Sequence, residues 1–87
     1  MKKTLADQQK FFESYFETLI HSSVKLVKDA QGRKLKIIVK YLKKFFLEKV
    51  ITKETLLVIY QMFSAVFPHS NAYKEYYDIL LQLTKSS

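Results

Sequence analysis

The sequence has no cysteine, no tryptophan, one glycine and one proline among its 87 residues. Without cysteine, a disulfide framework, a thiolate zinc site and a cysteine nucleophile are all excluded. A single glycine also excludes a glycine-rich phosphate loop, and so few turn-forming residues leave little room for the tight turns of an all-β fold. Long apolar runs are missing too, since no stretch reaches the ~20 apolar residues of a membrane span. These absences predict an all-α protein.

The residues that are present are sufficient for one hydrophobic core. The hydrophobic fraction is 48%, with seven Phe and six Tyr, and such a composition argues against disorder. We expect residues 1–87 to form a single domain. The first residues include two lysines, but polar side chains follow where a signal peptide would have an uninterrupted apolar stretch. We therefore expect an uncleaved cytoplasmic protein, or one peripheral to the inner face of the membrane.

Apolar residues recur at spacings of three and four through most of the chain, which indicates amphipathic helices. The first helix is predicted to start near Thr4 or Asp7. It is predicted to end at Gln31-Gly32, because glycine readily takes the left-handed conformation that terminates helices. A possible earlier bend lies at His21-Ser22-Ser23, but the apolar pattern continues past it. A second helix is predicted over 33–49.

A third helix is predicted to begin at Thr52, which is a good N-cap residue. It is expected to break at 68–71, where Ser70 or Asn71 can cap a fourth helix. Four helices with short connections predict an antiparallel up-down-up-down four-helix bundle.

Positive charge is concentrated in the middle of the chain. The formal net charge is +7, yet residues 25–53 alone hold ten Lys or Arg against Asp29 and Glu48, a net of +8. Helical spacing gathers part of this charge on one face of the second helix, at Arg33, Lys36, Lys40, Lys43 and Lys44. Such a face attracts phospholipid headgroups, nucleic acid or an acidic protein surface. The alternative is a solvated face that keeps the protein soluble.

The sequence carries no recognisable active site. His21 and His69 are the only histidines, and neither has a second ligand at metal-binding spacing. The serines have no nucleophile elbow around them, and the paired carboxylates lie on solvated helix faces. We therefore expect no catalytic residues, no metal and no cofactor, and we expect the protein to act by contact rather than as an enzyme.

The segment YLKKFFLEKVITKETLLVIYQMF, residues 41–63, carries a family resemblance. Its aromatic-rich helix end, short Ile-Thr step and Leu-x-x-Ile-Tyr helix resemble the join between the second and third helices in some immunity proteins against pediocin-like (class IIa) bacteriocins. Those proteins are small, basic and cysteine-poor, and they fold as antiparallel four-helix bundles. The likeness in architecture covers nearly the whole chain, although the family has no specific motif.

The resemblance implies a function that composition cannot supply. Immunity proteins of this family are thought to protect the producer by acting from the cytoplasmic side on the mannose-type sugar transporter that the bacteriocin uses as receptor. Specificity in the family lies largely in the C-terminal half. Here that implies a binding site formed by Pro68, His69, Ser70, Asn71, Tyr73, Lys74, Tyr76 and Tyr77.

Two other interpretations remain open at this stage. A small basic bundle can bind nucleic acid through phosphates. However, the chain has a single arginine, and the basic helix offers no Asn or Gln among its lysines, whereas base readout favours Arg, Asn and Gln. The sequence therefore argues against nucleic acid as the partner. The third helix is apolar around most of its circumference, so a homodimer through that helix is also possible.

Overall fold

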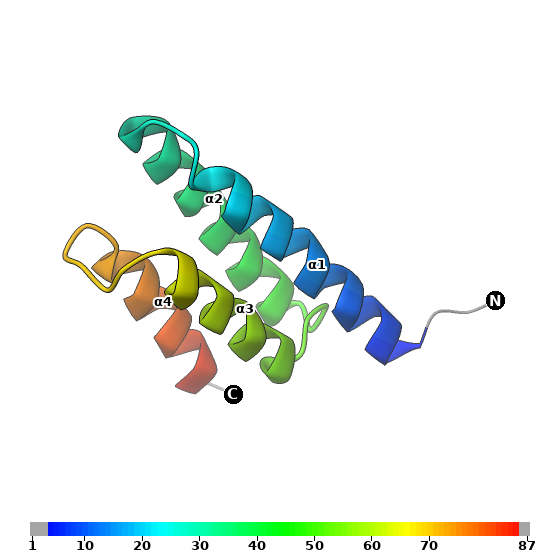
Figure 1. The fold of residues 1–87 in the computed structure, drawn as a ribbon. Coiled ribbons are helices and arrows are strands. Elements are labelled where there is room, and N and C mark those ends of the chain that lie inside the picture. Colours follow the sequence, from blue (N-terminus) through cyan, green and yellow to red (C-terminus); the bar gives the residue numbers. More distant parts are fainter. Residues whose placement is uncertain (1–3, 86–87) are drawn as a thin grey trace.

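Four α-helices and no strand make up the part of the chain that the computed structural model describes, residues 4–85. The helices are α1 (Leu5–Ser23), α2 (Lys28–Leu47), α3 (Lys53–Val66) and α4 (Lys74–Lys85). Their arrangement is shown in Figure 1. The prediction of an all-α protein with four helices is confirmed.

The helices pack as two pairs, one laid on the other. Figure 1 shows α1 beside α2 and α3 beside α4. Between the pairs, α1 packs on α3 and α2 packs on α4, while α2 also touches α3. Within residues 4–85, α1 and α4 make no contact and lie at opposite corners. Helices that follow one another in sequence are thus in contact, but the main contacts between the two pairs join α1 to α3 and α2 to α4.

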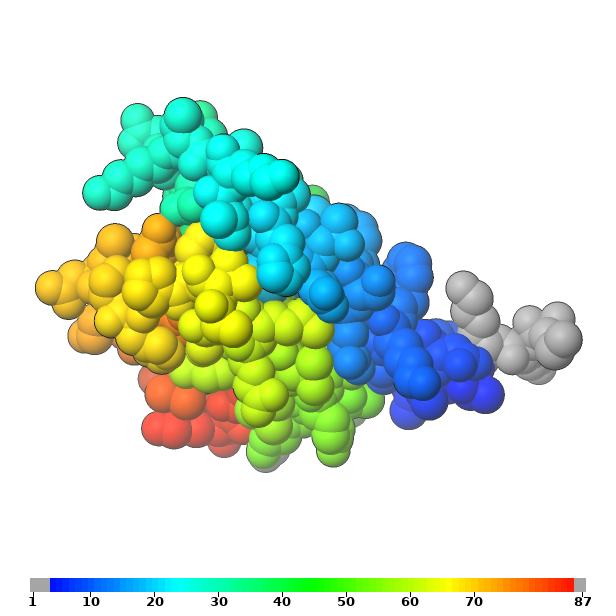
Figure 2. Space-filling model, viewed as in Figure 1, coloured from blue at the N-terminus to red at the C-terminus, as the bar shows by residue number. Residues whose placement is uncertain are grey.

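The α1–α2 pair is longer than the pair it covers. The two helices have 19 and 20 residues, whereas α3 and α4 have 14 and 12. The loop end of the long pair therefore projects beyond α3 and α4, as the cyan region of Figure 2 shows. Apolar side chains from every helix meet between the pairs, and the fully buried ones include Phe16, Ile20, Leu35, Leu42, Leu56, Ile59, Phe63 and Leu80.

The start of α1 agrees with the sequence prediction. The Asp7 backbone N–H donates to the Thr4 hydroxyl at 3.2 Å, and the Thr4 backbone N–H donates to an Asp7 carboxylate oxygen at 3.3 Å. This reciprocal pair is a capping box, which satisfies two donors that a helix start otherwise leaves free.

The predicted break at Gln31-Gly32 is wrong. The first helix ends at Ser23, and α2 begins at Lys28, five residues before its predicted start. Gly32 lies in the second turn of α2 and does not have a positive φ. A glycine inside a helix costs only about 1 kcal/mol relative to alanine, so the packing of the rest of α2 outweighs it.

Local hydrogen bonds end α1 instead. The hydroxyls of Ser22 and Ser23 both donate to the Leu19 carbonyl, at 3.0 and 2.7 Å. Serine side chains that bond to nearby backbone in this way compete with helix continuation. The Gln31 side-chain amide then donates to the Ser23 carbonyl at 3.1 Å, so α2 caps the end of α1.

The connection from α2 to α3 is closed by two capping motifs. Lys49 has a φ of 62°. The N–H groups of Lys49 and Val50 donate to the carbonyls of Phe46 and Phe45, at 3.1 and 2.8 Å. These bonds form a Schellman motif with lysine in its left-handed position. Thr52 then caps α3 by accepting the Thr55 N–H at 3.2 Å, as predicted.

The third helix ends near the predicted break, but the connection from α3 to α4 is longer than predicted. Phe67 takes an extended conformation before Pro68, which a following proline favours. The fourth helix begins only at Lys74, after a turn in which the Tyr73 N–H donates to the Ser70 carbonyl at 3.0 Å. The prediction that Ser70 or Asn71 caps α4 is therefore wrong, because this turn separates both residues from the helix.

Candidate functional site

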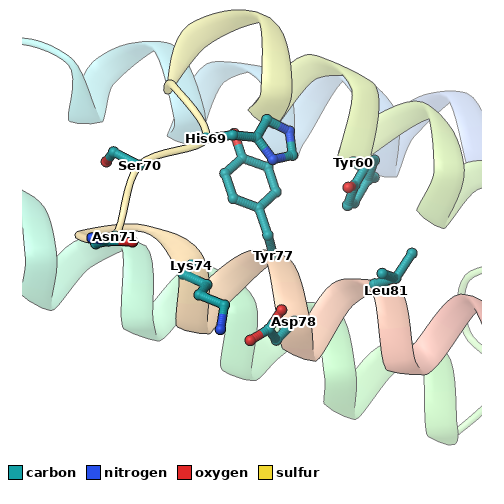
Figure 3. Close-up of a pocket in the computed structure, with 8 residues that line it drawn as sticks. All are labelled: Tyr60, His69, Ser70, Asn71, Lys74, Tyr77, Asp78 and Leu81. Atoms are coloured by element: carbon teal, nitrogen blue, oxygen red, sulfur yellow. The ribbon is translucent and has the colours of Figure 1, made fainter.

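A surface pocket lies where the loop between α3 and α4 meets these two helices. Its volume is about 280 Å³, and Figure 3 shows the side chains around it. Five of its lining residues belong to the predicted C-terminal site, namely His69, Ser70, Asn71, Lys74 and Tyr77. Tyr60, Asp78 and Leu81 complete the lining.

A histidine stacked on a tyrosine forms one wall of this pocket. The rings of His69 and Tyr77 lie nearly parallel, with centroids 3.8 Å apart and an interplanar angle of 14°. His69 Nε2 also lies 3.4 Å from the Ser64 hydroxyl on α3. The imidazole of an otherwise exposed loop residue thus has two contacts within the fold.

Tyr77 anchors the pocket to the core. Its ring is buried, and its hydroxyl donates to the Phe67 carbonyl at 2.5 Å, just before the loop starts. Burial raises the pKa of Tyr77 above its usual 10.0, so at neutral pH the phenol is a protonated donor. The side chain therefore holds the end of α3 against α4 and fixes the loop that carries His69.

Opposite charges stand on the α4 side of the pocket. Lys74 and Asp78 are both exposed and are one helical turn apart on α4. Figure 3 shows both side chains on the same rim. With the Asn71 amide and the Ser70 hydroxyl, the rim can donate hydrogen bonds to the polar groups of a peptide and accept hydrogen bonds from them. Tyr60 and Leu81 offer apolar contact. This combination suits a protein partner.

The other predicted C-terminal residues have different positions. Pro68, Tyr73 and Tyr76 do not line this pocket. The Tyr73 hydroxyl donates to the Gln31 side-chain oxygen at 2.7 Å, and the Tyr76 hydroxyl donates to the Gly32 carbonyl at 3.0 Å. Burial, followed by the charges of Glu75 and Tyr73, raises the pKa of Tyr76 above its usual 10.0. Both tyrosines join the start of α4 to the start of α2.

The predicted basic face is present on α2. Its five members, Arg33, Lys36, Lys40, Lys43 and Lys44, are all exposed. The buried residues of the same helix, such as Leu35 and Leu42, occupy the opposite side. No acidic residue occurs between Asp29 and Glu48, so the field along most of this helix is uniformly positive.

The sequence analysis missed an apolar groove between α1 and α2. It has a volume of about 350 Å³ and is lined by Tyr15, Leu19, Leu26, Ala30, Arg33, Lys34, Ile37, Ile38 and Tyr41. Four of these side chains, Tyr15, Leu26, Ile37 and Tyr41, are exposed large hydrophobic residues. Ile37 and Tyr41 are four residues apart and lie beside the buried residues of α2. Their helical spacing in the sequence could therefore have indicated an exposed apolar strip.

No cluster that could hold a metal ion was found among residues 4–85, where groups of three or more His, Asp or Glu were sought. None of the four helices combines the length and the apolar character that crossing a bilayer requires. Every buried polar side-chain atom in the described part of the chain has a hydrogen-bond partner.

Comparisons with family models, with curated proteins and with solved structures found no match for this chain. The resemblance to the immunity proteins therefore remains a prediction from the sequence. The pocket, the basic face and the groove have to be interpreted from their own chemistry.

Proposed function

We propose that this protein is a bacteriocin immunity protein that protects its producer against a pediocin-like bacteriocin. In this proposal it acts from the cytoplasmic side on the mannose-type transporter complex that serves as receptor. It acts by binding and not by catalysis. The up-down-up-down course of the helices, predicted from the short connections, is part of the same proposal.

The observation that carries the proposal is the pocket between α3, α4 and their loop. Sequence resemblance pointed to the C-terminal half, and five residues of that region converge on one pocket. The pocket combines a stacked imidazole, an amide, a hydroxyl and two opposite charges with apolar side chains. Convergent polar groups around an apolar floor are typical of recognition sites.

The basic face of α2 contributes in a different way. Its lysines are point charges on flexible stems, which attract an anionic surface without reading its detailed shape. Attraction of this kind raises the rate of encounter more than it raises selectivity. We assign the attraction to α2 and the selectivity to the pocket.

The test is survival of a sensitive strain that expresses the chain and is challenged with a panel of class IIa bacteriocins. Protection against at least one of them is expected, seen as a rise in the inhibitory concentration. Protection against none, with the protein present in the soluble extract, contradicts the proposal.

Variants of the pocket refine this test. Lys74→Ala and Asn71→Ala are expected to reduce protection, because both residues line the pocket and neither is buried. Lys85→Ala is the matched control, since it removes an exposed lysine from the same helix outside the pocket. Equal loss of protection in Lys74→Ala and Lys85→Ala would show that charge, and not the pocket, is responsible.

A further inference from the structure

The groove between α1 and α2 presents exposed apolar side chains on a surface that the other helices leave open. The groove is lined by residues 15–41 alone, and no residue of α3 or α4 takes part. Its rims carry Tyr15, Ile37 and Tyr41, which are 48%, 51% and 46% exposed. Monomeric proteins rarely leave contiguous apolar side chains of this size in water without a use.

Aromatic side chains extend this groove along the helix pair. Phe11, 56% exposed, stacks on Tyr15 with centroids 6.2 Å apart. On α2, Tyr41 stacks on Phe45 at 6.0 Å. Phe11 also lines a second hollow with Gln8, Phe12 and Val50. We call the groove and this extension together the aromatic seam. Its exposed large side chains are Phe11, Tyr15, Leu26, Ile37 and Tyr41.

Cations accompany the seam. Arg33 and Lys34 line the groove, and the Lys34 ammonium donates across it to the Ser22 hydroxyl of α1 at 3.1 Å. Arg33, Ile37, Tyr41 and Lys44 follow one another at spacings of four, four and three, so they form one stripe on α2. Among residues 4–85, no acidic side chain lines the groove or the second hollow. The seam is therefore both apolar and positive.

We propose that the aromatic seam is a docking surface for an anionic phospholipid bilayer. Tyrosine rings and short apolar side chains suit the boundary between headgroups and acyl chains, where one end is apolar and the other is hydrated. Lysine and arginine can bury their stems at that depth and keep their charges among the lipid phosphates. A basic amphipathic surface of this composition binds in the plane of the interface and does not span the membrane.

Charge complementarity favours the bilayer over the other occupants. A second copy placed seam to seam would bring two positive surfaces together in a protein with a net charge of +7, which like-charge repulsion opposes. Nucleic acid would pair with Lys36, Lys40 and Lys43, but it would gain little from exposed Ile37 or Leu26. An anionic bilayer satisfies the cations and the apolar side chains together.

The seam and the α3–α4 pocket share no residue. The protein can therefore lie on a membrane through the seam while the pocket remains available to a membrane-embedded receptor. The inference rests on the membrane location in the proposed function. Vesicle binding is nevertheless measured with purified protein and no receptor, so its failure and the failure of immunity are distinguishable.

The test is co-sedimentation of the purified protein with vesicles. Vesicles of phosphatidylglycerol and phosphatidylcholine are expected to retain the protein, and vesicles of phosphatidylcholine alone are not. The double variant Ile37→Ala/Tyr41→Ala is expected to lower the partition coefficient at least about tenfold, because it removes apolar contact without changing charge. Leu57→Ala is the control, since Leu57 is an exposed leucine on α3 that lines neither the groove nor the α3–α4 pocket, and this variant is expected to bind like the wild type.

Several outcomes overturn the inference. One is failure of the wild type to bind anionic vesicles at low salt. Another is equal binding by the seam variant and the control, which would assign retention to the lysines alone. A third is a wild-type dimer that Ile37→Ala/Tyr41→Ala converts to monomer, which would make the seam a homodimer interface. Far-UV circular dichroism on the seam variant and on the control verifies that each is folded.

Discussion

The side chain of Gln9 on α1 holds the backbone of Thr52, 43 positions further along the chain. Its oxygen accepts the Thr52 N–H at 2.8 Å, and its amide donates to the Val50 carbonyl at 3.1 Å. Gln9 is only 7% exposed. One polar side chain thus satisfies two backbone groups of the α2–α3 connection and fixes where α3 begins relative to α1.

Gln9→Ala is expected to destabilise the protein by about 1–3 kcal/mol, because a backbone donor and a backbone acceptor lose their partner in a half-buried site. Urea unfolding followed by circular dichroism measures the change in free energy of unfolding. Gln61→Ala, at an exposed position of α3, is the control and should change stability by less than about 0.5 kcal/mol. Equal changes in the free energy of unfolding for the two variants would mean that the hydrogen bonds of Gln9 contribute no net stabilisation.

Gly32→Ala is expected to stabilise the protein by about 0.5–1 kcal/mol, since glycine in a helix interior is less favourable than alanine. A Cβ added at this position would meet no atom within 4 Å. For a domain of this size the gain corresponds to a rise in Tm of about 2–8 °C. A fall in Tm would indicate that residue 32 ends a helix in the left-handed conformation, as the sequence alone suggested.

The sequence was sufficient for features determined by neighbouring residues. The start of α1 near Thr4 and the N-cap at Thr52 each depend on residues within three positions of one another, and both were predicted from the sequence. The end of α1 at Ser23 was indicated only as a possible bend, because it depends partly on the Gln31 side chain, which donates to the Ser23 carbonyl from the next helix. Gly32 was the residue most typical of a helix end in this region, but the packing of the rest of α2 stabilises a helix that continues through it.

The binding role of the candidate site stays a prediction, but part of its geometry follows from the sequence. The resemblance pointed to residues 68–77, five of which line one pocket, and the convergence of His69, Lys74 and Tyr77 follows from their closeness in sequence. The roles of Tyr73 and Tyr76 depend on which helix lies next to α4, which no local pattern states. The aromatic seam was missed for the same reason, since its exposure depends on which faces α3 and α4 cover.

Lys49→Gly is expected to stabilise the protein by about 1 kcal/mol. Lys49 has a φ of 62°, and the left-handed conformation costs about 1–2 kcal/mol for a residue with a Cβ but not for glycine. The matched comparison is Lys36→Gly in the middle of α2, which should destabilise by about 1 kcal/mol. Thermal unfolding of the two variants checks the opposite signs, and a loss of stability in both would contradict the Schellman motif at the end of α2.

Tyr77→Phe is expected to destabilise the protein by about 1–3 kcal/mol at neutral pH, because the buried Phe67 carbonyl loses its donor. The effect should depend on pH. Burial raises the folded-state pKa of Tyr77 above 10.0, so its contribution is complete below the unfolded pKa and is lost as pH rises through the folded pKa. The difference between wild type and Tyr77→Phe should therefore shrink as pH rises above 10.0, the usual pKa of a tyrosine. Urea unfolding below and above this pH measures it, with Tyr15→Phe, at an exposed position, as the control for general alkaline effects.

The triple variant Lys36→Gln/Lys40→Gln/Lys43→Gln is expected to remain folded, with a stability equal to or slightly above that of the wild type. The three side chains are exposed. Lys36 and Lys40 are like charges one turn apart, which is mildly unfavourable, by about 0.2–0.5 kcal/mol. Binding to anionic vesicles should weaken and become less sensitive to salt, because fewer charges then face the lipid. A marked loss of stability would show that these lysines support the fold, and unchanged vesicle binding would limit the electrostatic attraction to Arg33, Lys34 and Lys44 beside the aromatic seam.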